Sequence, residues 1–207
     1  VSSALERAST VAFVAIEPTA GVYSFTHDQI QEAAYTLVPQ EERPAFHWKL
    51  CQILWKPVSS KEDVCKLPLI VGQITKCVSE IKAKDDRRKA ASILLRAGRK
   101  ASSSSAFGTA LSYLQLAIDL LGKKRWHENY DLCLSLHNLA AEVSYGVGDS
   151  VRLDGLTNSV FLYAKNYDDK IPAYSMKILS LGSANKLQEA MDLGLEVLRN
   201  VGEPFGR

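Results

Sequence analysis

A histidine near the start of a predicted helix is the side chain best placed in this sequence to bind a charged ligand. Residues 23–35 read YSFTHDQIQEAAY, in which Thr26 is predicted to be the helix N-cap and Gln29 completes a capping box. His27 would then be the first helical residue, beside unpaired backbone N–H groups and the positive end of the helix dipole. This position predicts a phosphate-binding histidine, and an ordinary surface or capping histidine is the alternative interpretation.

The other residues that could bind a metal or catalyse a reaction have simpler interpretations. His47, next to Trp48, and His137, among leucines, are predicted to be core or flanking residues instead of metal ligands. The serines at 102–105 are predicted to form a turn, because no base stands near them in the sequence. Four cysteines with wide, irregular spacings are predicted to be buried free thiols: Cys51, Cys65, Cys77 and Cys133. We therefore expect no catalytic residue, no metal site and no enzyme activity in this chain.

Composition narrows the class of protein. The 207 residues are 46% apolar and 23% charged, which is ordinary for a folded globular chain and argues against bulk disorder. The net charge of +2 is too small to indicate nucleic acid or an anionic membrane. Glu6 and Arg7 interrupt the first apolar stretch, and no apolar run is long enough to span a bilayer. A cytoplasmic location without membrane contact is the expectation, and the missing initiator methionine predicts a piece of a longer protein.

Basic residues form two clusters that could suggest DNA binding. Acidic side chains lie among them, and no aromatic residues suited to base stacking are interleaved. A solvated surface is therefore the preferred interpretation of these residues: Arg87, Arg88, Lys89, Arg96, Arg99, Lys100, Lys123, Lys124 and Arg125.

The first third of the chain predicts a helix, a small hairpin and two further helices. A short helix is expected at 3–9 and a strand at 11–16, followed by a break at 18–21 and a second strand, VYSF. This hairpin leads into a helix at 27–37, and together these are the parts of a winged-helix unit. A longer helix is expected at about 41–55, with one buried face made of Phe46, Leu50, Ile53 and Leu54.

The rest of the chain predicts helices only. After a loop that begins at Pro57, residues 67–81 carry apolar side chains at helical spacing and are expected to bridge two halves: Leu69, Ile70, Ile74, Val78 and Ile81. Six helices are expected at about 86–103, 106–122, 127–146, 150–166, 168–181 and 185–201. Taken in pairs they repeat at roughly 40 residues, which predicts a right-handed α-solenoid of the tetratricopeptide type. The clearest apolar stripe belongs to the second helix: Phe107, Ala110, Leu111, Leu114, Ala117, Ile118 and Leu121.

Several phrases of the sequence resemble a known family. FTHDQIQEAAYTLVPQEERPAFHWKL, beginning at Phe25, resembles the end of the nucleotide-binding module of STAND-class signalling ATPases. The resemblance continues through LLRAGRKASSSSAFGTALSYLQLAIDLL, Trp126, the stretch 130–136 and EAMDLGLEVLRNVGEP. Modules of this kind occur inside large multi-domain serine/threonine kinases and sensor histidine kinases, and the resemblance implies that Trp126 is a packing anchor.

The resemblance also implies a role for the histidine at the helix start. In such proteins a P-loop ATPase core precedes a winged helix, whose histidine touches the β-phosphate of bound ADP, and helical repeats follow. By position that histidine is His27, with Asp28 beside it, which makes these two the expected nucleotide-sensing residues. ADP or ATP with magnesium would belong to the core of the parent protein, because this chain holds no G-x-x-x-x-G-K-[ST] loop.

The sequence thus predicts a mainly α-helical regulatory segment with three parts. Residues 1–60 are expected to be the winged-helix-like end of an ATPase module, 61–84 a bridging helical segment, and 85–207 tetratricopeptide-like repeats that bind proteins or other domains of the same chain. The expected function is to couple the nucleotide state of the upstream core to protein interactions or oligomerisation. Two alternatives stay open: a plain helical-repeat scaffold without nucleotide coupling, and a winged-helix DNA-binding regulator.

Overall fold

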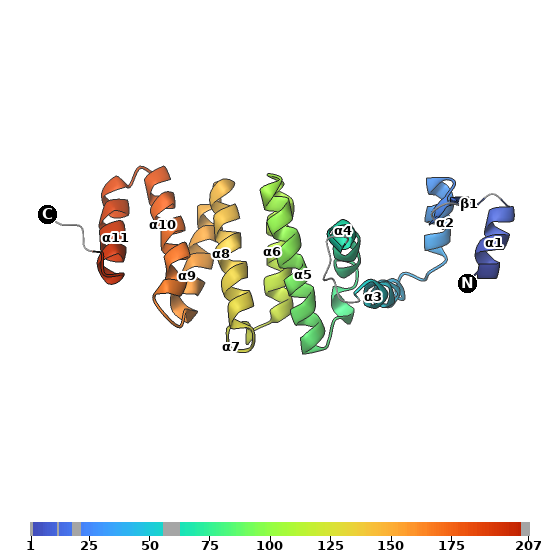
Figure 1. Cartoon of the computed structure of the whole chain (residues 1–207), viewed down its shortest axis with the longest axis horizontal. Helices are drawn as coiled ribbons and strands as arrows, with labels where there is room; N and C mark the ends of the chain where they lie inside the picture. The colour runs from blue at the N-terminus through green and yellow to red at the C-terminus, as the bar shows by residue number, and fades with distance from the viewer. Residues whose placement is uncertain (1, 12, 18–21, 56–62, 204–207) are drawn as a thin grey trace.

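The computed structural model describes residues 2–11, 13–17, 22–55 and 63–203. Within these ranges the chain is mainly α-helical, as predicted, and its strands form a two-stranded antiparallel sheet. Figure 1 shows the elements in one elongated row, with α1 (Ser2–Thr10) near one end and α11 (Leu187–Asn200) near the other. None of the described helices is long and apolar enough to cross a membrane.

The predicted hairpin between two short helices is present at the N-terminal end. The elements are α1 (Ser2–Thr10), β1 (Val14–Glu17), β2 (Val22–Phe25) and α2 (Asp28–Thr36). Val14 pairs with Phe25 across the sheet and its side chain is buried. Phe13 and Phe25 are 52% and 45% exposed, and no residue of α2 is buried. The N-terminal end therefore has few buried side chains. The predicted turn at 18–21 lies outside the described residues.

Helix α3 (Arg43–Leu54) buries a different face from the predicted one. Phe46 and Ile53, expected to point inward, are 39% and 66% exposed, and the other two residues of that face are only half-buried. His47 and Cys51, one helical turn apart, are buried instead. The helix carries apolar side chains on nearly all sides, so contact with its spatial neighbours, α4 (Asp63–Ile74) and the 3-10 helix η1 (Val78–Glu80), decides which face turns inward.

The bridging helix predicted at 67–81 is divided into two elements. Helix α4 (Asp63–Ile74) starts earlier than expected and ends at Ile74, and η1 (Val78–Glu80) follows it after a turn. Ile70, Ile74 and Ile81 are buried, as their spacing indicated, whereas Leu69 is 52% exposed. The loop predicted to begin at Pro57 lies mostly outside the described residues.

All six long helices predicted for the second half are present, although their ends differ by a few residues. They are α5 (Lys84–Ser103), α6 (Phe107–Leu121), α8 (Tyr130–Gly146), α9 (Ser150–Tyr163), α10 (Ile171–Ser183) and α11 (Leu187–Asn200). Two short elements, α7 (Arg125–Glu128) and η2 (Asp168–Lys170), lie in the connections between pairs. Figure 1 shows the pairs α5–α6, α8–α9 and α10–α11 following one another along the row.

The three hairpins turn in the same way. After α5, α8 and α10 one residue has a positive φ angle: 59° at Ser105, 76° at Gly148 and 58° at Asn185. In each case the next N–H donates to the carbonyl five residues earlier, as in the bond of 2.9 Å from Ala106 to Ala101. This is the Schellman arrangement, which pairs helix-end carbonyls that would otherwise lack partners.

Close packing joins α5 to α6. The predicted stripe of α6 is confirmed, because six of its seven residues are buried and Phe107 is half-buried. Gly98 on α5 faces Leu114 so closely that a Cβ added to the glycine would lie 2.9 Å from the leucine Cγ. The core continues through α8 and α9 to Ala173 on α10, whereas α11 has no buried residue.

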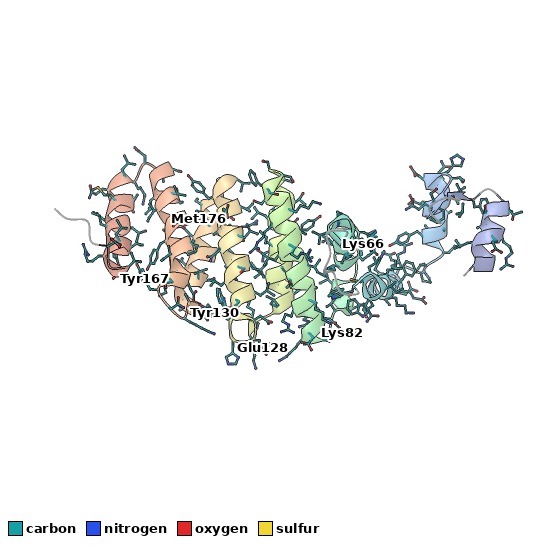
Figure 2. All side chains as sticks on the ribbon, viewed as in Figure 1. Lys66, Lys82, Glu128, Tyr130, Tyr167 and Met176 are labelled. Carbon is teal, nitrogen blue, oxygen red and sulfur yellow. The ribbon has the colours of Figure 1, made fainter. Side chains whose placement is uncertain are left out.

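Tyr130, at the start of α8, bonds to residues of the segment between α9 and α10. Figure 2 shows Tyr130 at the start of α8. Its hydroxyl donates to the Asp169 carboxylate and accepts the backbone N–H of Lys165 at 2.8 Å. The ammonium group of Lys165 lies 4.1 Å from the centre of the tyrosine ring. These contacts fix the second hairpin relative to the third.

Candidate functional sites

The predicted N-cap before α2 is shifted by one residue. The helix begins at Asp28, so His27 is the N-cap residue, with extended backbone angles of φ −145° and ψ 144°, and its side chain forms no capping bond. Thr26 continues the hairpin instead: its backbone N–H and its hydroxyl both donate to the carbonyl of Phe13, at 3.2 Å and 3.3 Å. The prediction that Thr26 caps the helix and that His27 is its first residue is therefore wrong by one position.

His27 and Asp28 are both exposed at the N-terminal end of α2. An exposed imidazole beside the first N–H groups of a helix is accessible to an anion. The adjacent Asp28 carboxylate would repel the same anion at close range. The nucleotide-sensing role of these two residues stays a prediction.

His47 lies in the interior, as predicted for a core or flanking histidine. It is 4% exposed, and its ring nitrogens bond to the hydroxyl of Tyr35 at 2.9 Å and to Oε1 of Gln73 at 2.7 Å. Because the Gln73 oxygen is an acceptor, Nδ1 carries the proton and Nε2 accepts from Tyr35. The bonds join α2, α3 and α4. Within the described ranges, no group of three or more histidine, cysteine or carboxylate side chains is arranged to hold a metal ion.

A pocket of about 690 Å³ lies between α2 and the pair α3–α4. The bonded side chains of Tyr35, His47 and Gln73 form part of its wall. The exposed rings of Phe25 and Phe46 line it, and so do the carboxylates of Asp28 and Glu32 on α2. Lys76 also lines it, so the pocket combines apolar surface with charges of both signs.

His137 also belongs to the core, as predicted. It is 2% exposed, its Nδ1 donates to the carbonyl of Cys133 at 2.7 Å, and its ring centre lies 4.7 Å from that of Trp126. Burial disfavours the charged imidazolium and lowers the pKa of His137 to about 4. Trp126 is buried and stacks on Tyr163 at 5.4 Å, so it packs between helices as its resemblance to the family implied.

Three of the cysteines are buried free thiols, as predicted: Cys51, Cys77 and Cys133. Interaction between the thiols of Cys51 and Cys77 raises the pKa of Cys51 and lowers the pKa of Cys77, and the Cys77 thiol also donates to the carbonyl of Ile74 at 3.7 Å. Burial raises the pKa of Cys133 to about 11. The side chain of Cys65 lies outside the part that the structure describes.

The first helices of the three hairpins line a second pocket, of about 350 Å³. Ser135, Asn138 and Glu142 of α8 lie between Arg99 of α5 and the α10 residues Pro172, Ser175 and Met176; Figure 2 labels Met176. The amide oxygen of Asn138 is buried and has no hydrogen-bond partner among the described residues. The sequence did not single out this set, because its members are distributed over three helices. We call these residues, with Leu139, the groove.

Several basic residues of the two clusters have structural partners. The guanidinium groups of Arg87 and Arg125 donate to the carbonyls of Ile81 and Gly122, at 2.9 Å and 3.2 Å. Arg88 lies 3.5 Å from the carboxylate of Asp85. These contacts agree with the interpretation of a mixed-charge, solvated surface.

The comparisons with known proteins find a distant relative of this chain. No protein-family model and no solved structure matches the chain. The chain is 23% identical over 204 residues to the hybrid signal transduction histidine kinase G of Dictyostelium discoideum, and the match covers 87% of this chain. It spans 6% of that relative's length.

Proposed function

We propose that this chain is a regulatory, protein-binding segment of a signalling protein, and that its helical array holds an extended peptide in the groove. The similarity to a signalling kinase supports the first half of the proposal. The groove between α5, α8 and α10 supports the second. In this proposal the three hairpins are a short α-solenoid of the tetratricopeptide type, and the chain has no catalytic activity of its own.

The polar lining that three helices bring together in the groove is the observation that carries the proposal. Asn138, Ser135, Ser175 and Glu142 give the groove amide, hydroxyl and carboxylate groups that can exchange hydrogen bonds with the backbone of an extended peptide. Arg99 would attract a carboxylate of the ligand. Leu139 and Met176 supply apolar contact.

Asn138→Ala is expected to weaken peptide binding by about tenfold, because it removes a central contact of the groove. Peptides selected from a displayed random library against the whole chain provide the ligands, and fluorescence anisotropy gives their affinities. Asn158→Ala on α9, an exposed asparagine that does not line the groove, is the matched control and should leave affinity unchanged. Selected peptides that bind both variants equally well would place binding elsewhere and refute the groove.

A second candidate function is supported by the exposure of His27 at the start of α2. Here the N-terminal elements are a winged-helix-like unit that closes on an ADP held by a neighbouring ATPase domain, with His27 contacting the diphosphate and Asp28 beside it. Nucleotide would then bias the position of this unit, and the helical array would carry that bias to a partner.

His27→Ala is expected to raise the dissociation rate of ADP by about tenfold in a longer protein that includes the ATPase domain, since one charge-assisted contact is lost. His127→Ala, also exposed but on α7, is the control and should keep the original rate. Stopped-flow release of a fluorescent ADP analogue measures both. Equal rates in the two variants would remove His27 from the mechanism.

A further inference from the structure

The pocket between α2 and α3–α4 has the chemistry of a site for one kind of protein segment. Its volume of about 690 Å³ lies in the range of ligand-binding clefts, and it shares no lining residue with the groove. Phe25 and Phe46 are 45% and 39% exposed, and both line the pocket. Apolar rings left open beside a concave surface favour an apolar occupant.

The charges along α2 define the occupant further. Asp28 and Glu32 are four residues apart on one face of α2, so a single cation can reach both carboxylates. Neither carboxylate forms an ion pair with any residue in the described ranges. Next to the apolar rings, they present a negative site that an arginine or lysine side chain would complement.

Positive charge gathers at the other end of α2. The guanidinium of Arg43 lies 4.5 Å and the ammonium of Lys76 lies 5.8 Å from the centre of the Tyr35 ring. Tyr35 stands one turn beyond Glu32, so the acidic and basic ends of the pocket are separated along the helix. A basic side chain is therefore attracted only at the end formed by Asp28 and Glu32.

We propose that this pocket binds a protein segment in which a basic side chain stands between apolar ones. The basic side chain lies against Asp28 and Glu32, and the apolar side chains contact Phe25, Phe46 and Leu50. The hydrogen-bonded set of Tyr35, His47 and Gln73 ties α2 to α3 and α4, so the site is formed before the segment arrives.

The test uses a capped tripeptide with arginine between two leucines, added to the isotope-labelled whole chain and followed by NMR. Amide shifts are expected to concentrate on α2 and on the first half of α3. Glu32→Gln should weaken binding by about threefold, the loss typical of one exposed ion pair. Glu41→Gln, an exposed glutamate that does not line the pocket, is the matched control and should have no effect.

A second pair of variants tests the apolar contact. Phe46→Ala should remove most of the binding, whereas Ile53→Ala, also exposed on α3 but away from the pocket, should preserve it. A tripeptide with glutamate in place of arginine should cause no shifts at α2. Equal binding of the two tripeptides, shifts located elsewhere, or no shifts at millimolar peptide would each overturn the proposal. Asn138 does not line this pocket, so Asn138→Ala should not change tripeptide binding. A negative result for the tripeptide therefore does not bear on the proposal that the groove binds peptides, and the two proposals can fail separately.

Discussion

Replacing Leu114 with alanine is expected to lower the free energy of unfolding by about 3 kcal/mol, within the range found for large-to-small substitutions in a packed core. The side chain of Leu114 is fully buried and lies against Gly98 at the closest approach of α5 and α6. The glycine leaves little room for the backbone to move inward, so the space vacated by the leucine should persist as a cavity. Urea unfolding followed by circular dichroism measures the loss.

The neighbouring glycine supplies a stringent control for this packing. Gly98→Ala alone should cost about 1–2 kcal/mol, because the new methyl group would lie 2.9 Å from the Cγ and Cδ2 atoms of Leu114. In the Leu114→Ala background the methyl group added at position 98 would occupy the cavity left by the leucine, so the destabilisation caused by Gly98→Ala should disappear. Gly155→Ala on α9, where nothing lies within 4 Å, should instead stabilise the chain by about 0.5–1 kcal/mol. Simple additivity of the Gly98 and Leu114 substitutions would contradict the proposed contact.

Acidification is expected to remove about 3 kcal/mol of stability through His137 alone, since each unit of pKa shift corresponds to about 1.4 kcal/mol. Burial lowers the pKa of His137 from 6.5 to about 4. The unfolded chain therefore binds a proton that the folded chain does not accept between these two values. The stabilisation is complete above pH 6.5 and is lost as the pH falls towards about 4.

Two measurements identify His137 as the source of this pH dependence. Urea unfolding at several pH values should show a smaller slope in His137→Leu than in the original chain, whatever the absolute stability of the variant. His127→Gln, an exposed histidine on α7, should keep the original slope. Titration of the His137 ring followed by NMR should show no protonation above pH 5. A midpoint near 6.5 would contradict the effect of burial.

The helices of the array could be predicted because each has a local signal. The stripe of α6 repeats at helical spacing from Phe107 to Leu121, and all but the first of its residues are buried. Gly148 stands after α8 at a positive φ angle, which glycine adopts without strain. Where the apolar periodicity and the turn residues indicate the same helix boundaries, the sequence predicts the helix. Only the neighbouring helix against which it packs is decided by the tertiary structure.

The predictions for the N-cap of α2 and for the buried face of α3 were wrong because contacts with residues distant in the sequence determine both features. Thr26 has the right type and spacing for an N-cap, but its hydroxyl bonds to Phe13, thirteen residues earlier. On α3 the surface of α4 and η1 selects His47 and Cys51 as the buried residues. No local pattern contains either piece of information.

The two pockets lay beyond prediction for the same reason. The groove requires Arg99, Asn138 and Ser175, which come together only when the hairpins stack. The pocket beside α2 depends on how far that helix stands from α3. Sequence singled out His27 at the edge of this region because a helix start has a recognisable signature, but the neighbouring concave surface has none.

The shared turn of the three hairpins has a consequence for divergence. The bend requires one left-handed residue and one long-range amide bond, and serine, glycine and asparagine fill the left-handed position in turn. Substitutions can therefore accumulate in these turns while the angle between the two helices of each hairpin stays the same. We expect the curvature of the array to be conserved even between relatives with low sequence identity. It depends on one residue with a positive φ angle in each turn, and several residue types can supply that angle.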